Sequence, residues 1–240
     1  MAQAAIPARS TGRTETTGAS DAARWRWAGG LGLAHLVLVI GAFSLEQVEA
    51  VEHGSAPAAV LRVYGGVSVT RVELASYVEA MAFLPLLAAL VLLSRLLGRR
   101  TETGRVAAQS ALGLGIAYIA STFAIGFPPL TAAVYAAHNG VDAGTLTTVN
   151  DLRNYGFLLQ VALSAAFALA LGIAATAEHQ LTKWVGWGGI AVGVGGLAVS
   201  PFAHNAISMA WMIWWLGVCV LCLKGGPKAV RVPEFSGRAV

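Results

Sequence analysis

Residues 157–177 have the sequence FLLQVALSAAFALALGIAATA, which contains no Asp, Glu, Lys or Arg. An α-helix needs about 20 consecutive apolar residues to cross the hydrocarbon core of a bilayer. A surface helix of a soluble protein carries charged residues on the side that faces water. Because this segment has none on any side, it predicts a transmembrane helix.

Five further apolar runs lie near residues 28–45, 77–97, 106–125, 184–200 and 207–223. Hydrophobic residues make up 56% of the 240 positions, charged residues only 12%, and the mean hydropathy is +0.66, values typical of membrane proteins. The pattern predicts an all-α fold, a polytopic membrane helix bundle of about six transmembrane helices within residues 24–223. We expect residues 1–23 to form a disordered cytoplasmic tail and residues 224–240 to form a second one. A cleaved signal peptide is the alternative for the first run, but five more runs follow it.

The positions of Lys and Arg predict the orientation of these helices, since cytoplasmic loops carry an excess of both. With six crossings that start inside, only Arg62, Arg71 and Arg153 fall outside. Both termini are therefore expected in the cytoplasm. The ratio of 13 arginines to three lysines suits a high-GC bacterial source. In a bacterium, the expected location is the plasma membrane. The basic residues on the inner side are Arg9, Arg13, Arg24, Arg26, Arg95, Arg99, Arg100, Arg105, Lys183, Lys224, Lys228, Arg231 and Arg238.

The expected partners follow from the same distribution of charge. The formal net charge is +4, but the basic residues form short clusters between apolar runs, which does not indicate nucleic-acid binding. Membrane lipids are the expected neighbours, and a membrane protein partner or a homo-oligomer is left open. Cys219 and Cys222 lie in the last apolar run, where we expect them to be small buried side chains.

Two prolines interrupt the third apolar run after Gly126. Because the residue before a proline avoids helical geometry, Pro128 and Pro129 are expected to end that helix. Residues 130–137 are apolar but too short to span a bilayer. They are compatible with a re-entrant segment or with a helix at the outer interface.

Ionisable and strongly polar groups inside a bilayer are costly, so each one indicates a structural or functional role. His35 is the deepest, and it is expected either to relay protons or hold a ligand, or to make a single hydrogen bond to a neighbouring helix. We predict that Glu79 and Arg153 form an ion pair in an outward-facing polar cleft. Asp151, Asn154 and Gln160 would be its neighbours, available to a small polar ligand. The alternative is that these residues only hold helices together.

A second group of polar residues follows the first apolar run. Glu46, Glu49 and His53 have helical spacing, so a continued helix would present an acidic and imidazole face able to bind a divalent cation. A solvated helix end is the more common meaning of such a run, and we predict no metal site. The sequence contains no Walker loop, G-x-G-x-x-G, H-E-x-x-H or G-x-S-x-G, and it predicts neither a cofactor nor catalytic residues.

The stretch from residue 150 to residue 223 contains the start of one helix, the connection after it and a glycine-rich run that follows. The characteristic residues are Asn150, Asp151, Gly156 and Phe157, then Thr182, Lys183, Trp184, Val185, Gly186 and Trp187. In these features the stretch resembles a family of uncharacterised six-helix bacterial membrane proteins, frequent in actinobacteria and defined by a domain of unknown function. The resemblance implies a six-helix architecture and no functional residues.

Three functional classes remain compatible with the sequence. The first is an accessory or sensor-like protein of unknown activity, which the lack of any catalytic motif favours. The second is a small permease or ion-linked carrier that uses the outer cleft, and the third is an intramembrane enzyme acting on a lipid or isoprenoid. A carrier needs a water-accessible path to His35, whereas an enzyme needs an acid and a base beside a groove open to lipid.

Overall fold

The computed structural model describes residues 15–48 and 51–226, except for the side chains of residues 15–19 and of Phe127. The described residues form helices and connections and contain no strand, which confirms the all-α prediction. Five candidate membrane spans are long and apolar enough to cross a bilayer. The chain is therefore a helical membrane protein. Its helices are α1 (Glu15–Glu46), α2 (Pro57–Gly65), α3 (Val69–Leu97), α4 (Glu102–Ile125), α5 (Phe127–His138), α6 (Ala143–Glu178) and α7 (Lys183–Leu223).

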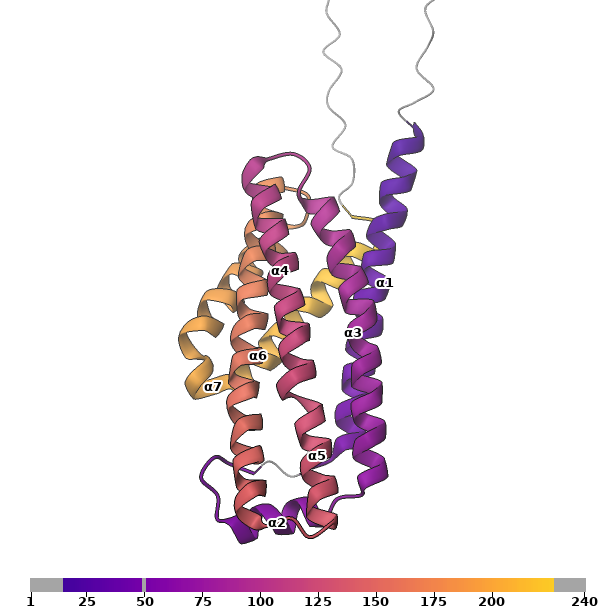
Figure 1. The fold of residues 1–240 in the computed structure, drawn as a ribbon. Coiled ribbons are helices and arrows are strands. Elements are labelled where there is room, and N and C mark those ends of the chain that lie inside the picture. Colours follow the sequence, from indigo (N-terminus) through magenta and orange to yellow (C-terminus); the bar gives the residue numbers. More distant parts are fainter. Residues whose placement is uncertain (1–14, 49–50, 227–240) are drawn as a thin grey trace, which may run out of the picture.

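Helix α7 contains two of the predicted spans. Pro201 lies inside it, and the backbone of Ala203 leaves helical geometry with φ −142° and ψ 41°. A proline inside a helix lacks the N–H for the backbone ladder and crowds the preceding turn, which accounts for a break here. Figure 1 shows α7 running along the bundle and then returning, so that both of its ends lie at the same end of the molecule. Each half is about 20 residues long, or about 30 Å, which matches the hydrocarbon thickness.

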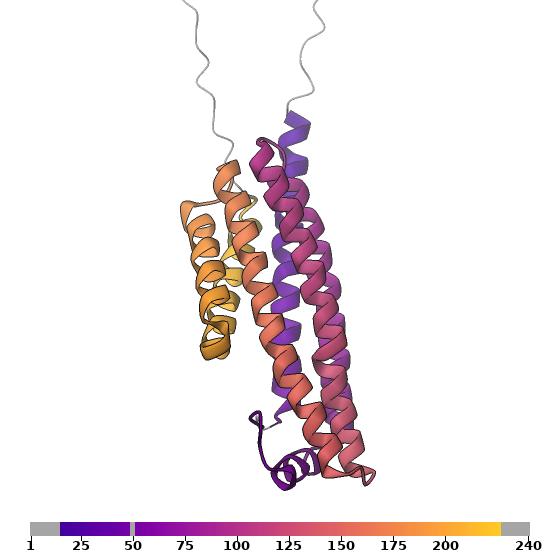
Figure 2. The same cartoon turned by 60° about the vertical axis from the view of Figure 1, so that its left-hand side comes forward.

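The hairpin made by α7 is shorter than the rest of the bundle (Figures 1 and 2). Helix α6 has 36 residues and α1 has 32, which correspond to about 54 Å and 48 Å. Helix α6 reaches well past the turn of α7 toward α2, which lies across the far end of the bundle, whereas α1 starts beyond the other helices and ends closer to the level of that turn. Residues near the turn of α7 are therefore level with the middle of α6.

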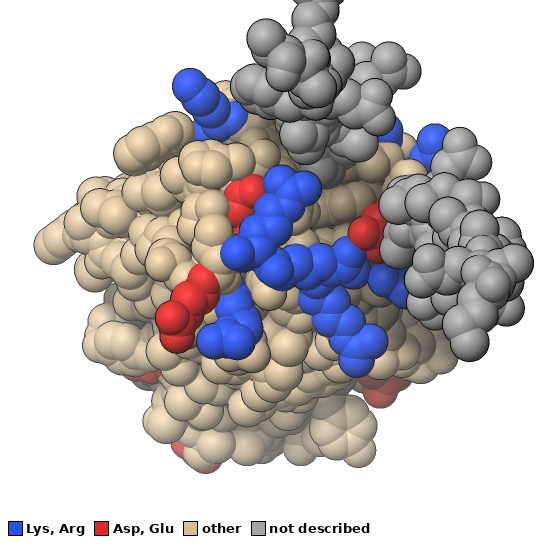
Figure 3. Space-filling view, turned by 90° about the horizontal axis from the view of Figure 1, so that it is seen from above, with Lys and Arg blue, Asp and Glu red and all other residues tan. Residues whose placement is uncertain are grey.

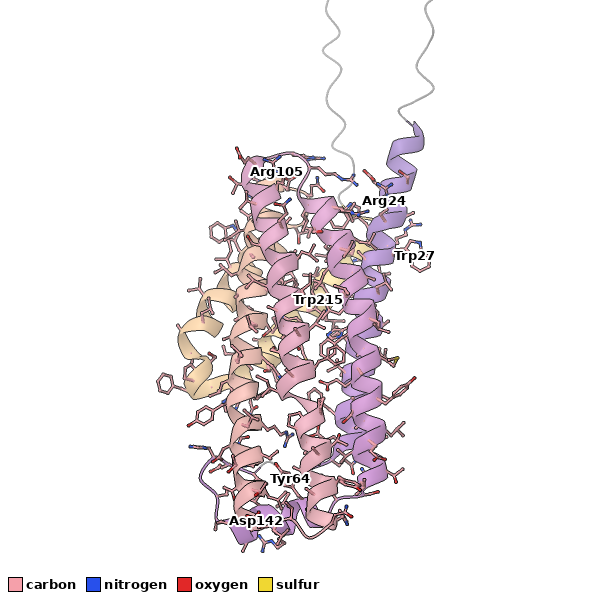
Figure 4. All side chains as sticks on the ribbon, viewed as in Figure 1. Arg24, Trp27, Tyr64, Arg105, Asp142 and Trp215 are labelled. Carbon is pink, nitrogen blue, oxygen red and sulfur yellow. The ribbon has the colours of Figure 1, made fainter. Side chains whose placement is uncertain are left out.

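The two ends of the bundle differ in charge. One end, here called the basic end, carries the start of α1, the end of α7 and the α3–α4 and α6–α7 connections (Figure 1). Lys and Arg side chains gather on this face in Figure 3, and Figure 4 places Arg24 and Arg105 there. Tyr64 and Asp142 lie at the opposite end, here called the α2 end, and Trp215 lies between the two.

A buried carboxylate holds the basic end together. Glu178, the last residue of α6, accepts hydrogen bonds from the backbone N–H groups of Arg100 and Thr101, each at 2.9 Å. The Thr101 side chain in turn accepts the Gly104 N–H and caps α4. Asp21 of α1 accepts a charge-assisted bond of 2.6 Å from Arg99 in the same connection.

The pair between Asp21 and Arg99 lies in a region that sequence analysis assigns to a disordered tail. Residues 1–14 of that tail lie outside the described residues, but α1 begins at Glu15. Residues 15–23 are therefore helical. The tail prediction is wrong for them because the helix continues beyond the membrane and is fastened through Asp21, a contact that composition does not reveal. The second predicted tail, from residue 227 onward, lies outside the described residues.

The α2 end contains structure that hydropathy does not indicate. Three pieces of helix here lie outside the predicted spans: α2, the first turns of α3 and the first turns of α6. Asp142 caps α6, since its carboxylate accepts a hydrogen bond of 2.9 Å from the Thr145 N–H. Hydrogen bonds from Thr145 hold the pKa of Asp142 below its usual value. Helix α5 continues α4 in the same direction, so residues 130–137 are not re-entrant. A separate apolar cluster joins these elements: Val51, Val60, Tyr64, Val72, Leu130, Ala133, Val134 and Leu146.

Glycines bring α6 and α7 into close contact. A methyl group added at Gly189 would lie 2.8 Å from the Ala168 carbonyl oxygen and 3.0 Å from Gly172 Cα, so no larger residue fits between the two backbones. Such close approach of small residues is a common way for membrane helices to associate. Trp214 fastens the returning half of α7, since its indole N–H donates to the Val185 carbonyl at 3.0 Å.

We predict that Gly189→Ala lowers the free energy of unfolding by about 1–3 kcal/mol, because the added methyl group must push apart two backbones. Tryptophan fluorescence during denaturant unfolding in detergent micelles measures this change. The matched control is Gly195→Ala on the same helix, where nothing lies within 4 Å of the added group. Alanine there is expected to be neutral or to stabilise the helix by up to about 1 kcal/mol. Equal stability of the two variants would contradict the proposed contact.

Candidate functional site

A pocket of about 580 Å³ lies among the helices, which is within the range for small-molecule sites. Its walls come from α1, α3, α4, α5, α6 and α7, together with the segment that follows α1. Apolar and aromatic side chains form much of the lining. The polar residues that line it include His35, Glu46, Glu79, Arg153, Asn154, Gln160, Ser164, His204, Asn205 and Ser208.

The pocket runs from an exposed rim to a buried floor. Phe43 is 48% exposed and Met209 is 55% exposed, and both line the pocket where the end of α1 faces the turn of α7. His35, Glu79 and Trp211 line it too, but their exposed fractions are 1%, 6% and 5%. The mouth therefore lies between the end of α1 and the turn of α7, and the floor lies inside the bundle.

The structure brings five of the six residues predicted as a ligand site to this pocket. They are His35, Glu79, Arg153, Asn154 and Gln160. The sixth, Asp151, is not part of the lining, and its carboxylate lies 2.9 Å from Nδ1 of His53 instead. Whether the five bind a ligand stays a prediction.

The predicted ion pair between Glu79 and Arg153 is wrong. Arg153 donates to Glu46, with 2.7 Å between Nη2 and Oε1. The Glu46 side chain is only 7% exposed, and it is the last residue of α1, at the point where α1 meets the first half of α6. Among the described residues, Glu79 makes no hydrogen bond or ion pair, although it lines the same pocket.

The metal hypothesis depended on a continued first helix, and the helix does not continue. Helix α1 ends at Glu46, and Gln47 has a positive φ of 41°. Glu46 is bonded to Arg153, His53 lies against Asp151, and Glu49 is outside the described residues. No group of three His, Cys, Asp or Glu residues suited to a metal ion occurs in the part of the chain that the structure describes.

His35 is held by the third helix. Its Nδ1 lies 3.0 Å from the carbonyl oxygen of Ala82. Because a carbonyl only accepts, Nδ1 carries the proton and donates, which leaves Nε2 of the neutral ring as an acceptor. The structure thus contains the single hydrogen bond to a neighbouring helix that was one of the two expectations for His35. The second ring nitrogen, Nε2, has no hydrogen-bond partner among the described residues, and His35 lines the wall of a pocket.

Two aromatic rings pack against His35 and a third packs against both of them, and the sequence did not place these rings at the site. The His35 ring centroid lies 5.5 Å from that of Phe83 and 6.5 Å from that of Trp211. Tyr118 contacts both, at 5.8 Å from Phe83 and 6.0 Å from Trp211. All three line the pocket, and together with His35 they form its aromatic floor. No sequence signal groups them, because the contacts depend on how α1, α3, α4 and α7 pack.

Several buried donors in the pocket have no hydrogen-bond partner. They are the amide Nε2 of Gln160 and the indole Nε1 of Trp211, and the ring nitrogen Nδ1 of His204 also has no partner among the described residues. A buried polar group without a partner costs about 1–3 kcal/mol. Such groups are frequent where a polar ligand or ordered water binds. The amide and the indole are therefore suited to hydrogen-bond acceptors on a bound molecule.

The α2 end supports the wall that Arg153 and Asn154 form. Asn154 donates to the Val51 carbonyl at 2.9 Å, and Tyr64 of α2 donates to the side-chain oxygen of Asn150 at 2.8 Å. Burial raises the pKa of the Tyr64 phenol above its usual value, so the neutral donor persists. These bonds join the segment after α1 to α6 and position the polar face that contains Arg153.

Comparisons with known proteins give one match. No family model matches the sequence, and no solved structure matches it. Over 123 residues, or 49% of this chain, the sequence is 29% identical to a Haemophilus influenzae protein named "Putative metabolite transport protein". The chain covers 26% of that protein's length. The similarity agrees with the membrane character that the apolar helices establish.

We predict that Arg153→Gln lowers the free energy of unfolding by about 1–3 kcal/mol, since it leaves the buried Glu46 carboxylate without its cation. The double variant Glu46→Gln with Arg153→Gln should recover most of this loss. Arg71→Gln is the control, because the bond of Arg71 to Gln47 lies on the exposed surface. Denaturant unfolding in micelles measures all three, and a double variant no more stable than Arg153→Gln would count against the pair.

Proposed function

We propose that this chain is a carrier for a small polar metabolite, with the pocket as its substrate site. The observation that supports this best is the pocket itself, with its exposed rim and its floor of buried polar groups. Buried His35, Glu79 and Gln160 are costly in a membrane protein unless they serve packing or binding, and all three line the same space.

The sequence comparison supports the same class of function. The Haemophilus influenzae protein is named for metabolite transport, and its similar stretch covers about half of this chain. Because the chain covers 26% of that protein, transport by this chain is a proposal of ours and its substrate is not inferred from the name. The resemblance to the six-helix bacterial family stays a prediction.

We place the protein in a bacterial plasma membrane with both termini in the cytoplasm. The support is the distribution of basic residues, since the start of α1, the end of α7 and the α3–α4 and α6–α7 connections carry most of the Lys and Arg side chains (Figure 3). In this orientation the α2 end is extracytoplasmic. The mouth of the pocket then lies on the outer side of the floor formed around His35.

A sensor or accessory role is the second candidate, and one observation favours it. On the basic side of the pocket, α3 and α7 bury Leu86, Leu90, Leu93, Trp214 and Trp215, none more than 3% exposed. This layer closes the pocket toward the cytoplasm. A receptor keeps such a layer closed, whereas a carrier must open it. An enzyme is not proposed, because His35 is bonded to a carbonyl rather than to an acid.

Reporter fusions test the orientation. We expect a fluorescent protein fused after Val240 to fluoresce in bacterial cells, because the C-terminus is cytoplasmic. Alkaline phosphatase inserted at Gly140, in the turn between α5 and α6, should be active, because it is exported. Phosphatase activity at the C-terminus would refute this topology.

Cysteine labelling separates a carrier from a receptor. In a Cys219→Ala, Cys222→Ala background, a membrane-impermeant maleimide added outside should label Gln160→Cys. If the chain is a carrier, Leu90→Cys becomes labelled from the cytoplasmic side of inverted vesicles in a fraction of molecules, because the layer opens. Glu102→Cys at the basic end is the positive control, since the Glu102 side chain is 83% exposed. Labelling of Gln160→Cys without any labelling of Leu90→Cys would exclude the carrier and favour the receptor.

A further inference from the structure

The charges that line the pocket do not balance. Among the described residues, its lining contains three formally charged side chains, Glu46, Glu79 and Arg153. Glu46 and Arg153 neutralise each other across 2.7 Å. Glu79 is left as a carboxyl group that is 6% exposed and has no hydrogen bond or ion pair with any described residue. A buried carboxyl group without a partner is neutralised either by a proton or by a cation that binds beside it. A positively charged occupant of the pocket would therefore displace the proton and pair with the carboxylate.

The neighbours of Glu79 also suit a cation. Glu79 and Phe83 are four residues apart on α3 and line the pocket on one helix face. Ala82, on the same turn, accepts the hydrogen bond from His35, so the imidazole lies against this turn with Nε2 as an acceptor. A carboxylate and a basic ring nitrogen are both acceptors, and they match the N–H donors of an amine.

Aromatic rings form the remaining part of the floor. Phe83, Tyr118 and Trp211 pack with ring centroids about 6 Å apart around His35. The faces of aromatic rings attract cations, and Trp does so most strongly. Nearer the mouth, Phe43, Met209 and Met212 provide an apolar and adaptable wall for the carbon skeleton of a ligand.

From these contacts we infer that the pocket takes a small organic cation, an amine with an apolar body, with Glu79 as its counterion and the aromatic floor around the ammonium group. The inference rests on the proposed function and names its substrate class. A carboxylate ligand is disfavoured because it would face Glu79, and Arg153 is already bonded to Glu46.

Three probes of similar shape and different charge test the inference on the full-length protein in lipid nanodiscs. They are 2-phenylethylamine, 2-phenylethanol and 3-phenylpropanoate, and binding is followed by calorimetry and by tryptophan fluorescence. The amine is expected to bind at least about tenfold more tightly than the alcohol, a difference of about 1.4 kcal/mol or more in binding free energy. The acid should not bind.

Glu79→Gln is expected to lower the affinity for the amine about tenfold or more and to leave the affinity for the alcohol unchanged. Glu73→Gln is the matched control, because Glu73 lies on the same helix with an exposed side chain and does not line the pocket. If Glu79→Gln does not fold, Glu79→Asp keeps the charge and should retain the preference for the amine. The comparison of the three probes on the unmodified protein needs no variant.

Each outcome separates this inference from the proposed function. If the alcohol or the acid binds as tightly as the amine, or if no probe binds, the cation inference is overturned. Whether the chain is a carrier is then decided only by the labelling of Gln160→Cys and Leu90→Cys. If the amine binds through Glu79 but Leu90→Cys never reacts, the cation site stands and the carrier fails.

Discussion

Hydrocarbon offers no hydrogen-bond partner, and this constraint shapes the whole molecule. The backbone of each span must bond within itself, which selects helices, and polar side chains must find partners inside the bundle. The bond of His35 to the Ala82 carbonyl and the bond of Trp214 to the Val185 carbonyl satisfy this requirement. Glu79 and Gln160 have no such partner among the described residues and line the pocket instead. The pocket is thus one place where the requirement is left unmet; in the described part of the chain, the Trp215 indole N–H, outside the pocket, is another.

The packing that creates the pocket depends on unequal helix lengths. Glycines allow the first half of α7 to lie directly against α6, and the break at Pro201 and Ala203 turns the helix back at mid-height of the bundle. The long helices continue past this turn, and the end of α1 faces it. The mouth lies at that junction, between a helix that ends and a helix that turns.

The Glu46–Arg153 pair connects this junction to the α2 end. It joins the last residue of α1 to the first half of α6 at a level where the side chains are mostly buried. The neighbouring bonds from Asn154 to Val51 and from Tyr64 to Asn150 hold the segment after α1 against α6. Because Arg153 bonds to Glu46, Glu79 is left without a cationic partner among the described residues.

The sequence by itself determined the fold class, because long apolar runs without charge favour helices in lipid. It also separated a basic end from the rest, and it singled out His35, Glu79, Arg153, Asn154 and Gln160, since polar groups within or beside apolar runs are visible without a structure. Only the tertiary structure decided that Arg153 bonds to Glu46, that α5 continues α4, and that Phe83 and Trp211 pack against His35. Those features depend on which helices touch and at what height. Glu46 and Arg153 are 107 residues apart in the sequence, and local hydropathy does not indicate that they are partners.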